Sequence, residues 1–155
     1  HSYSVRKDSL KMLLLQLAIG ALMIALTVSI HAIGFDFMIR RLNTVSSRFM
    51  VIFRGLWKNA VIIWATLAAF ILITLDVWLW ALLYRFIGAF DAMEPALYFS
   101  LSSFTTLGMG DVVLTEQWRI LSGVEAAGGF FLFGWTSAFI FEIITQIYRT
   151  ERQDH

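Results

Sequence analysis

Three long stretches of the chain are almost entirely hydrophobic, and each is long enough to cross a membrane as a helix. The first runs from Met12 to Gly34, the second over residues 60–84 and the third over residues 118–147. About 20 apolar residues span the hydrocarbon of a bilayer, so each stretch predicts one transmembrane helix. The third would be about 45 Å long, and we expect it to be tilted or to project beyond the hydrocarbon.

A fourth hydrophobic segment, between the second and third stretches, is too short to cross. Residues 94–104 read EPALYFSLSSF. Pro95 suits the first turn of a helix, and Asp91 and Glu94 place negative charge near its positive end. We therefore expect a half-length helix over residues 95–105. Both of its ends must lie on one side of the membrane, because a single further span follows and the basic residues between the first two stretches place the end of that span in the cytoplasm.

The next residues, TTLGMGD at positions 105–111, must then return through the membrane as extended backbone. Such backbone has unpaired carbonyl groups, which are tolerated at this depth only where protein or a water-filled pathway surrounds them. Gly108 and Gly110 alternate with bulkier residues. Because glycine adopts positive φ without penalty, successive carbonyls can point the same way. Several such strands around one axis would form rings of oxygen able to replace the hydration shell of a cation.

The composition is that of an integral membrane protein, since 59% hydrophobic residues and a mean hydropathy of +0.73 leave too little charge for a soluble surface. The net charge of +1 indicates no nucleic-acid partner, because the cationic residues lie at the ends of apolar runs instead of forming a face. The absence of cysteine excludes disulfides and thiolate metal sites. No hydrolase, nucleotide-binding or metalloprotease motif occurs, so we expect no catalytic site and no enzymatic activity.

Basic residues between the first two hydrophobic stretches set the expected orientation. Residues 35–58 contain one acid, Asp36, against five basic residues, Arg40, Arg41, Arg48, Arg54 and Lys58. The positive-inside rule places this basic loop in the cytoplasm. Its part over residues 42–56 could lie along the membrane surface as an amphipathic helix. The N-terminus and residues 86–116 then face outside, and residues 149–155 form a short cytoplasmic tail.

The order of these segments resembles the pore of potassium channels. TTLGMGD is similar to the TTVGYGD selectivity filter of that family. In its simple bacterial two-helix members, two adjacent aromatic residues precede the filter, as Tyr98 and Phe99 do here. A tryptophan follows the filter aspartate by seven positions, as Trp118 does. We therefore delimit a pore domain over residues 59–148, and residues 1–34 form an additional N-terminal transmembrane helix.

The resemblance implies an all-α membrane protein with three transmembrane helices, a re-entrant pore helix and a selectivity-filter loop. The outer helix would cover residues 60–84, the pore helix 95–105, the filter 106–110 and the inner helix 118–147. It also implies a homotetramer, in which each of four identical subunits contributes one filter strand, in the lipid bilayer of a bacterial plasma membrane. Potassium ions in the pore would be the bound ligands, with no cofactor.

The resemblance also gives each filter residue a role. Potassium would be coordinated by oxygens of four residues, Thr106, Leu107, Gly108 and Met109. Gly110 would lie at the outer end of the filter. Asp111 would form a ring of negative charge at the outer mouth, which raises the local concentration of cations.

One departure from the family sequence bears on ion selectivity. Met109 replaces a tyrosine, whose phenol in the family hydrogen-bonds to surrounding aromatic residues and holds the width of the filter. We expect a channel that conducts potassium passively, and two alternatives stay open. One is a non-selective monovalent cation channel, and the other is a non-conducting membrane subunit that uses the pore fold structurally.

Acidic residues within the hydrophobic stretches need partners, because a charged carboxylate costs at least a few kcal/mol in the hydrocarbon. Asp76 and Glu125 lie roughly 10 to 14 Å deep, level with the short helix. We hypothesise that they hydrogen-bond, ionised or protonated, to its serines, Ser100, Ser102 or Ser103. Together with Tyr98 and Phe99 they would then support the filter from behind. The alternative is that each carboxylate snorkels or caps a neighbouring helix.

Residues of the third stretch recur at three- and four-residue spacing and so share one helix face: Phe131, Gly134, Ala138 and Glu142. The resemblance implies that this face lines the cavity or the inner gate. Glu142 would then form a carboxylate ring at the inner mouth, and the alternative places it among lipid headgroups near Arg149. Gln16 and His31 of the first stretch are interpreted as packing or interfacial residues.

Overall fold

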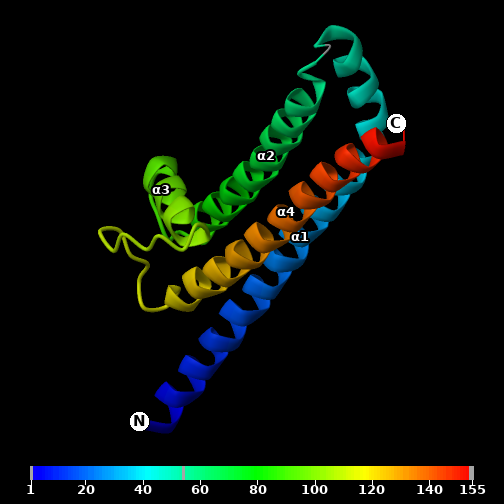
Figure 1. Cartoon of the computed structure of the whole chain (residues 1–155). Coiled ribbons are helices and arrows are strands. Elements are labelled where there is room, and N and C mark those ends of the chain that lie inside the picture. Colours follow the sequence, from blue (N-terminus) through cyan, green and yellow to red (C-terminus); the bar gives the residue numbers. More distant parts are fainter. Residues whose placement is uncertain (1, 54, 154–155) are drawn as a thin grey trace. The chain divides into compact units, whose positions relative to one another are not determined.

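The computed structural model describes residues 2–53 and 55–153, and side chains over residues 9–53 and 55–149. In this part the chain forms four helices and no strand. They are α1 (Ser2–Ile52), α2 (Trp57–Phe86), α3 (Met93–Phe104) and α4 (Arg119–Gln153), as Figure 1 shows. Arg54 of the basic loop and residues 154–155 of the expected tail lie outside the described residues.

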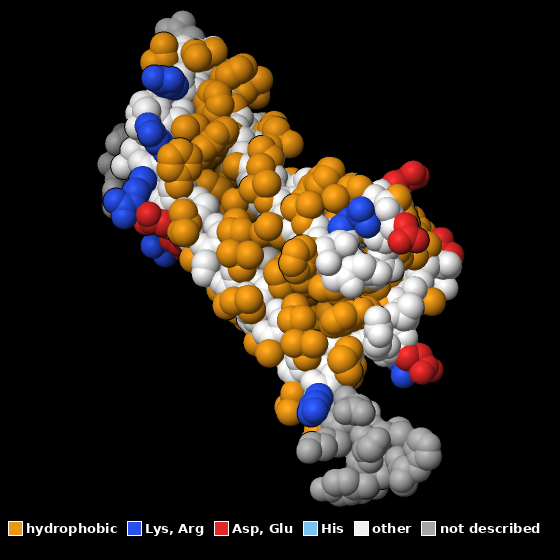
Figure 2. Space-filling model, turned by 180° about the vertical axis from the view of Figure 1, so that it is seen from behind, with side chains coloured by type: hydrophobic (Ala, Val, Ile, Leu, Met, Phe, Trp, Pro, Cys, Tyr) orange, Lys and Arg blue, Asp and Glu red, His pale blue; other side chains and the backbone are white. Residues whose placement is uncertain are grey.

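Three of these helices are long and apolar enough to span a membrane. The spanning segments are Ser9–Ile52, Trp57–Phe86 and Arg119–Arg149, whereas α3 is too short. Figure 2 shows a face on which hydrophobic side chains cover most of the surface. Leu22, Ile33 and Phe130 are each exposed by more than 70%. Such a surface suits lipid and not water, so the expectation of a multi-pass all-helical membrane protein is confirmed.

The first helix is longer than the hydrophobic pattern indicated. We expected it to end at Gly34 and a basic loop to follow over residues 35–58, but α1 continues to Ile52. No proline or glycine interrupts the chain after Gly34 within this helix. Three apolar side chains in the additional part are buried, Phe35, Met38 and Leu42. Packing of this apolar face therefore extends the helix through a segment that also carries arginines.

The helices contribute to two compact units. One contains residues 29–74 and 132–155. Its core is formed by α1, α2 and α4 through seven buried residues, Phe35, Met38, Leu42, Val61, Ala65, Ile143 and Ile147. The ring of Phe35 stacks on Phe139 with a centroid distance of 4.0 Å, and it packs in T-shaped geometry with His31 and Trp135. His31 is fully buried there, as expected for a packing residue.

The other unit contains residues 1–28 and 75–131, and in it α1 lies parallel to α4. Three contacts connect the helices at four-residue intervals, pairing Gln16 with Ile120, Gly20 with Val124, and Ile24 with Gly128. Residue numbers rise in the same direction along both helices, so their N-terminal ends lie at the same side of this unit. Glycine on each helix lets the backbones approach closely.

Replacing Gly20 by leucine should force α1 away from α4. A Cβ atom at Gly20 would already lie 2.7 Å from Val124 Cγ1, and overpacking of this kind costs about 1–3 kcal/mol. We expect a lower midpoint of thermal unfolding in detergent, measured by circular dichroism. Gly123→Leu is the control, because a Cβ at Gly123 meets open space. Equal unfolding midpoints of the two variants would contradict the close packing.

Candidate functional site

Helix α3 and the loop that follows it form the candidate site. The first turn of α3 contains Glu94 and Pro95, and the helix ends where the N–H of Thr105 donates to the carbonyl of Leu101. The loop over residues 105–118 has no regular secondary structure and leads to α4. In Figure 1 α3 lies beside the C-terminal part of α2, with this loop between α3 and the start of α4.

The backbone of the loop alternates in handedness. Thr106, Gly108 and Gly110 have φ angles of 60°, 57° and 80°, whereas the residues between them have negative φ. Positive φ is free of penalty for glycine and uncommon for a β-branched residue such as threonine. Alternation in the sign of φ turns successive peptide planes so that their carbonyl oxygens can share one side. This is the conformation for which the two glycines were singled out in the sequence.

Ser102 of α3 holds the loop through two hydrogen bonds. Its carbonyl accepts the N–H of Gly108 at 3.1 Å, and its hydroxyl accepts the N–H of Met109 at 3.2 Å. The side chains of Leu107 and Met109 are more than 60% exposed in the single chain. The loop is therefore fixed to its own helix on one side and open on the other.

Tyr98 and Asp111 tie the end of the glycine-containing stretch back to α3. The phenol of Tyr98 donates a hydrogen bond of 2.9 Å to Asp111 Oδ2, and both residues are exposed. This bond to a carboxylate raises the pKa of Tyr98 above its ordinary value of 10.0. The bond is present while the phenol is protonated, and it is lost as the pH rises through that raised pKa.

Replacing Asp111 by asparagine should lower the pKa of Tyr98, because the neutral amide stabilises the protonated phenol less than a carboxylate does. The measurement is an absorbance titration of phenolate in each protein, from which the titration of the same protein with Tyr98→Phe is subtracted. The hydrogen bond is refuted if Tyr98 titrates at the same pH with and without the carboxylate.

A buried polar cluster joins three helices behind the loop. It consists of Tyr84 on α2, Ser100 on α3 and Glu125 on α4, all fully buried, together with the carbonyl of Val77 on α2. Tyr84 Oη lies 2.7 Å from Glu125 Oε2, and Ser100 Oγ lies 2.5 Å from Glu125 Oε1. Ser100 Oγ also lies 2.9 Å from the Val77 carbonyl oxygen.

The structure separates the residues that were expected to support the loop. Phe99 packs edge-on against Tyr84 in the interior, whereas its neighbour Tyr98 faces the loop. Glu125 contacts Ser100, and Asp76 is fully buried one residue before Val77. The hydroxyl of Ser102 accepts the N–H of Met109, and the backbone carbonyl of Ser103 accepts the N–H of Thr106.

Tyr84 was missed at the sequence level, because a tyrosine at the end of a span is typical of the membrane interface. Tyr84 lies seven residues after Val77 on the same face of α2, and this spacing could have indicated that Tyr84 faces the same interior as Val77.

Helix α4 approaches the end of α3 very closely. A Cβ atom at Gly129 would overlap the carbonyl oxygen of Phe104, the residue directly before Thr105. Phe104 is itself buried. Glycine at this position therefore allows the end of α3, from which the loop emerges, to lie directly on the backbone of α4.

The residues expected to line a cavity or inner gate are all exposed on α4 in the single chain: Phe131, Gly134, Ala138 and Glu142. Gln146, one turn further along, donates a hydrogen bond of 3.0 Å to Glu142. Their contribution to a pore depends on other subunits and stays a prediction. Among the described residues, no group of three or more His, Cys, Asp or Glu side chains is arranged to hold a metal ion.

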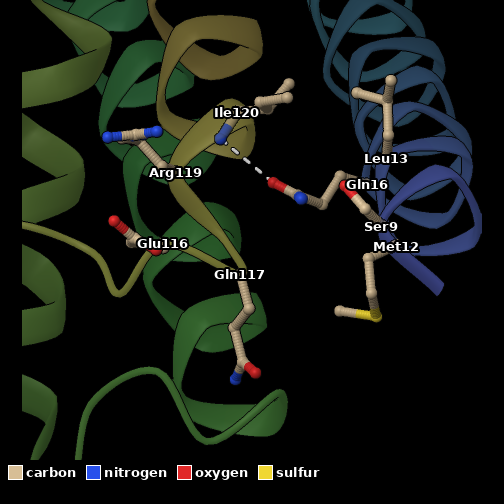
Figure 3. A pocket seen from close by; sticks show the side chains of 8 residues that line it. All are labelled: Ser9, Met12, Leu13, Gln16, Glu116, Gln117, Arg119 and Ile120. Atoms are coloured by element: carbon tan, nitrogen blue, oxygen red, sulfur yellow. Dashed lines mark hydrogen bonds between the residues drawn. The ribbon is translucent and has the colours of Figure 1, made fainter. Parts of the chain in front are cut away.

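A pocket not expected from the sequence lies between α1 and the start of α4. Its volume is about 510 Å³, and Figure 3 shows its lining, Ser9, Met12, Leu13, Gln16, Glu116, Gln117, Arg119 and Ile120. Gln16 is 4% exposed and accepts the N–H of Ile120 at 3.0 Å. This N–H belongs to the first turn of α4 and has no partner within its own helix, so α1 supplies the cap of α4.

These features define a class: a multi-pass helical membrane protein with a short helix and a glycine-containing loop between two spanning helices. Residues 59–146 match a family model described as ion channel. The match covers more than half of the chain, which therefore belongs to the ion channel family of two-helix pores that includes potassium channels. Helix α1 lies outside the matched region. No curated protein and no solved structure matches the chain.

Proposed function

We propose that the protein is a homotetrameric channel that conducts potassium passively through a filter over residues 106–110. Membership of the ion channel family supports ion conduction. The observation that carries the finer proposal is the positive φ at Thr106, Gly108 and Gly110. This alternation allows carbonyl oxygens from Thr106 to Met109 to face one axis, where they replace the water around a potassium ion.

The open side of the loop supports an assembly of several subunits, and the resemblance to potassium channels implies four of them. A single loop supplies oxygens from one direction, whereas a dehydrated cation needs oxygens on every side. Four copies of the loop around an axis complete the rings. The same assembly places four Asp111 carboxylates at the outer mouth, each held by a Tyr98 phenol, where they concentrate cations.

The inner helix completes the conduction path. In this arrangement α4 faces the axis, and its exposed residues line the cavity below the filter: Phe131, Gly134, Ala138 and Glu142. The carboxylates of Glu142 attract cations to the inner mouth. We place the channel in a bacterial plasma membrane, with the N-terminal ends of α1 and α4 on the outer side.

A non-selective monovalent cation channel is the second candidate, and Met109 favours it. Its thioether cannot donate a hydrogen bond, and its side chain is 61% exposed. In this chain the loop is held at this position by the backbone bond from Met109 to Ser102. A filter with less side-chain support adjusts more easily to sodium.

Purified protein in liposomes distinguishes the candidates. Potassium flux without sodium flux supports the first proposal, and similar flux of both ions supports the second. Absence of flux for either ion, under a range of pH, tension and lipid composition, supports a non-conducting subunit. Particle images of the same sample test the assembly, because the proposal requires four-fold symmetry with density on the axis at residues 106–109.

A further inference from the structure

The buried polar cluster contains more close oxygen contacts than an ionised Glu125 can satisfy. Three pairs of oxygens lie within hydrogen-bond distance: Tyr84 with Glu125, Glu125 with Ser100, and Ser100 with the Val77 carbonyl. Each hydrogen bond needs one proton. Tyr84 and Ser100 carry one hydroxyl proton each, and a carbonyl carries none. If each contact is a separate two-centre bond and no hydroxyl proton is shared, the third proton comes from Glu125.

We infer that Glu125 is a neutral, proton-bearing residue that positions α3, and with it the filter, by donating a hydrogen bond to Ser100. This inference rests on the proposed function for its effect on conduction, but not for the proton itself. The cluster then forms a chain with one direction. Tyr84 donates to Glu125 Oε2, Glu125 Oε1 donates to Ser100, and Ser100 donates to the Val77 carbonyl.

The surroundings of Glu125 agree with a neutral acid. The side chain is fully buried within a membrane-spanning helix, where an isolated carboxylate is strongly disfavoured. Among the described residues, no ion pair includes Glu125. Its two close partners are hydroxyl groups. The hydroxyl of a neutral carboxyl group can donate to Ser100, and its carbonyl oxygen can accept from Tyr84.

The hydrogen-bond chain reaches the filter through α3. Ser100 lies two residues before Ser102, whose carbonyl and hydroxyl hold the N–H groups of Gly108 and Met109. Val77 and Tyr84 both belong to α2, so the chain starts and ends on one helix and passes through α4 and α3. Loss of the central donor breaks the link between α3 and α4 at this level and leaves Ser100 with its bond to the Val77 carbonyl of α2 alone. Glu125 therefore acts on the filter through Ser100, as a positioning residue.

The test compares Glu125→Gln with Glu125→Leu. A glutamine amide can donate to Ser100 and accept from Tyr84, whereas leucine can do neither. We expect the ratio of potassium to sodium flux in liposomes to stay within about twofold of wild type for Glu125→Gln. For Glu125→Leu and Ser100→Ala we expect it to fall by roughly tenfold, a typical effect of leaving a buried partner unsatisfied. Ser122→Ala is the matched control, because this hydroxyl bonds only within α4.

A second measurement keeps the inference testable without conduction. Infrared spectra of the wild-type protein should contain a protonated-carboxyl C=O band that is absent from Glu125→Gln. If the band is missing from wild type, or if Glu125→Gln loses selectivity as Glu125→Leu does, Glu125 acts as a charge and the inference is wrong. If wild type carries the band but conducts no ions, the proposed function fails and the protonated Glu125 stands.

Discussion

Replacing Gly108 by valine should abolish the preference for potassium over sodium in liposome flux. Gly108 has a φ of 57°, and a β-branched residue in this region costs about 1–3 kcal/mol. Space is available for a side chain in the single chain, because a Cβ at Gly108 meets no atom within 4 Å. The expected effect therefore arises from the backbone. In the proposed tetramer, valine drives φ to negative values and turns one carbonyl of each filter strand away from the axis.

Gly88→Val is the matched control for this experiment. Gly88 lies in the turn after α2, has a φ of 71° and also meets open space. Its substitution should cost a similar amount of stability, visible in thermal unfolding, and should leave the flux ratio unchanged. If Gly88→Val loses selectivity to the same extent as Gly108→Val, the effect is one of general destabilisation. If Gly108→Val keeps its selectivity, the assignment of residues 106–110 as the filter is wrong.

The three spanning helices and the short helix could be predicted from the sequence because each depends on a local pattern. Twenty or more apolar residues in a row define a span whatever surrounds them. Pro95 and Glu94 define the start of α3 in the same way. The end of α1 could not be predicted, because it depends on packing of Phe35, Met38 and Leu42 in the core with α2 and α4. In the sequence, the basic residues of this segment indicated a cytoplasmic loop, and the apolar residues among them were therefore not recognised as a continuation of the helix.

In the candidate site, too, features that depend on residue type could be predicted, whereas features that depend on packing between helices could not. Positive φ could be predicted at Gly108 and Gly110 because glycine favours it. Thr106 also has positive φ, and nothing in its residue type predicts this. Comparing depths along two helices predicted a bond from Glu125 to one of three serines, Ser100, Ser102 or Ser103, and in the structure the partner is Ser100. Tyr84 joins them from a third helix, and only the three-dimensional arrangement brings its phenol to the carboxyl group. Gln16 and its contact with the start of α4 depend on the docking of α1, which lies outside the matched pore region.

Replacing Gly129 by alanine should destabilise the protein more than alanine at any other glycine of α4. The new Cβ would overlap the carbonyl oxygen of Phe104 and lie 2.9 Å from its carbonyl carbon. Both are backbone atoms and cannot rotate away as a flexible side chain can. Overpacking costs about 1–3 kcal/mol and more when backbone must move. We expect a clearly lower midpoint of thermal unfolding in detergent, and lower ion selectivity in the fraction that folds.

Gly128→Ala gives the opposite expectation on the neighbouring residue. A Cβ at Gly128 would lie 3.4 Å from Ile24 Cγ1, which is ordinary contact with a side chain. Alanine in place of a helical glycine stabilises by about 1 kcal/mol, so this variant should unfold at the same or a higher temperature. The two substitutions add the same atom one residue apart on the same helix. Equal unfolding midpoints would therefore show that α3 does not rest on the backbone of α4 at Gly129. The contact between Glu125 and Ser100 in the buried polar cluster would then remain to link α4 to α3 and the filter.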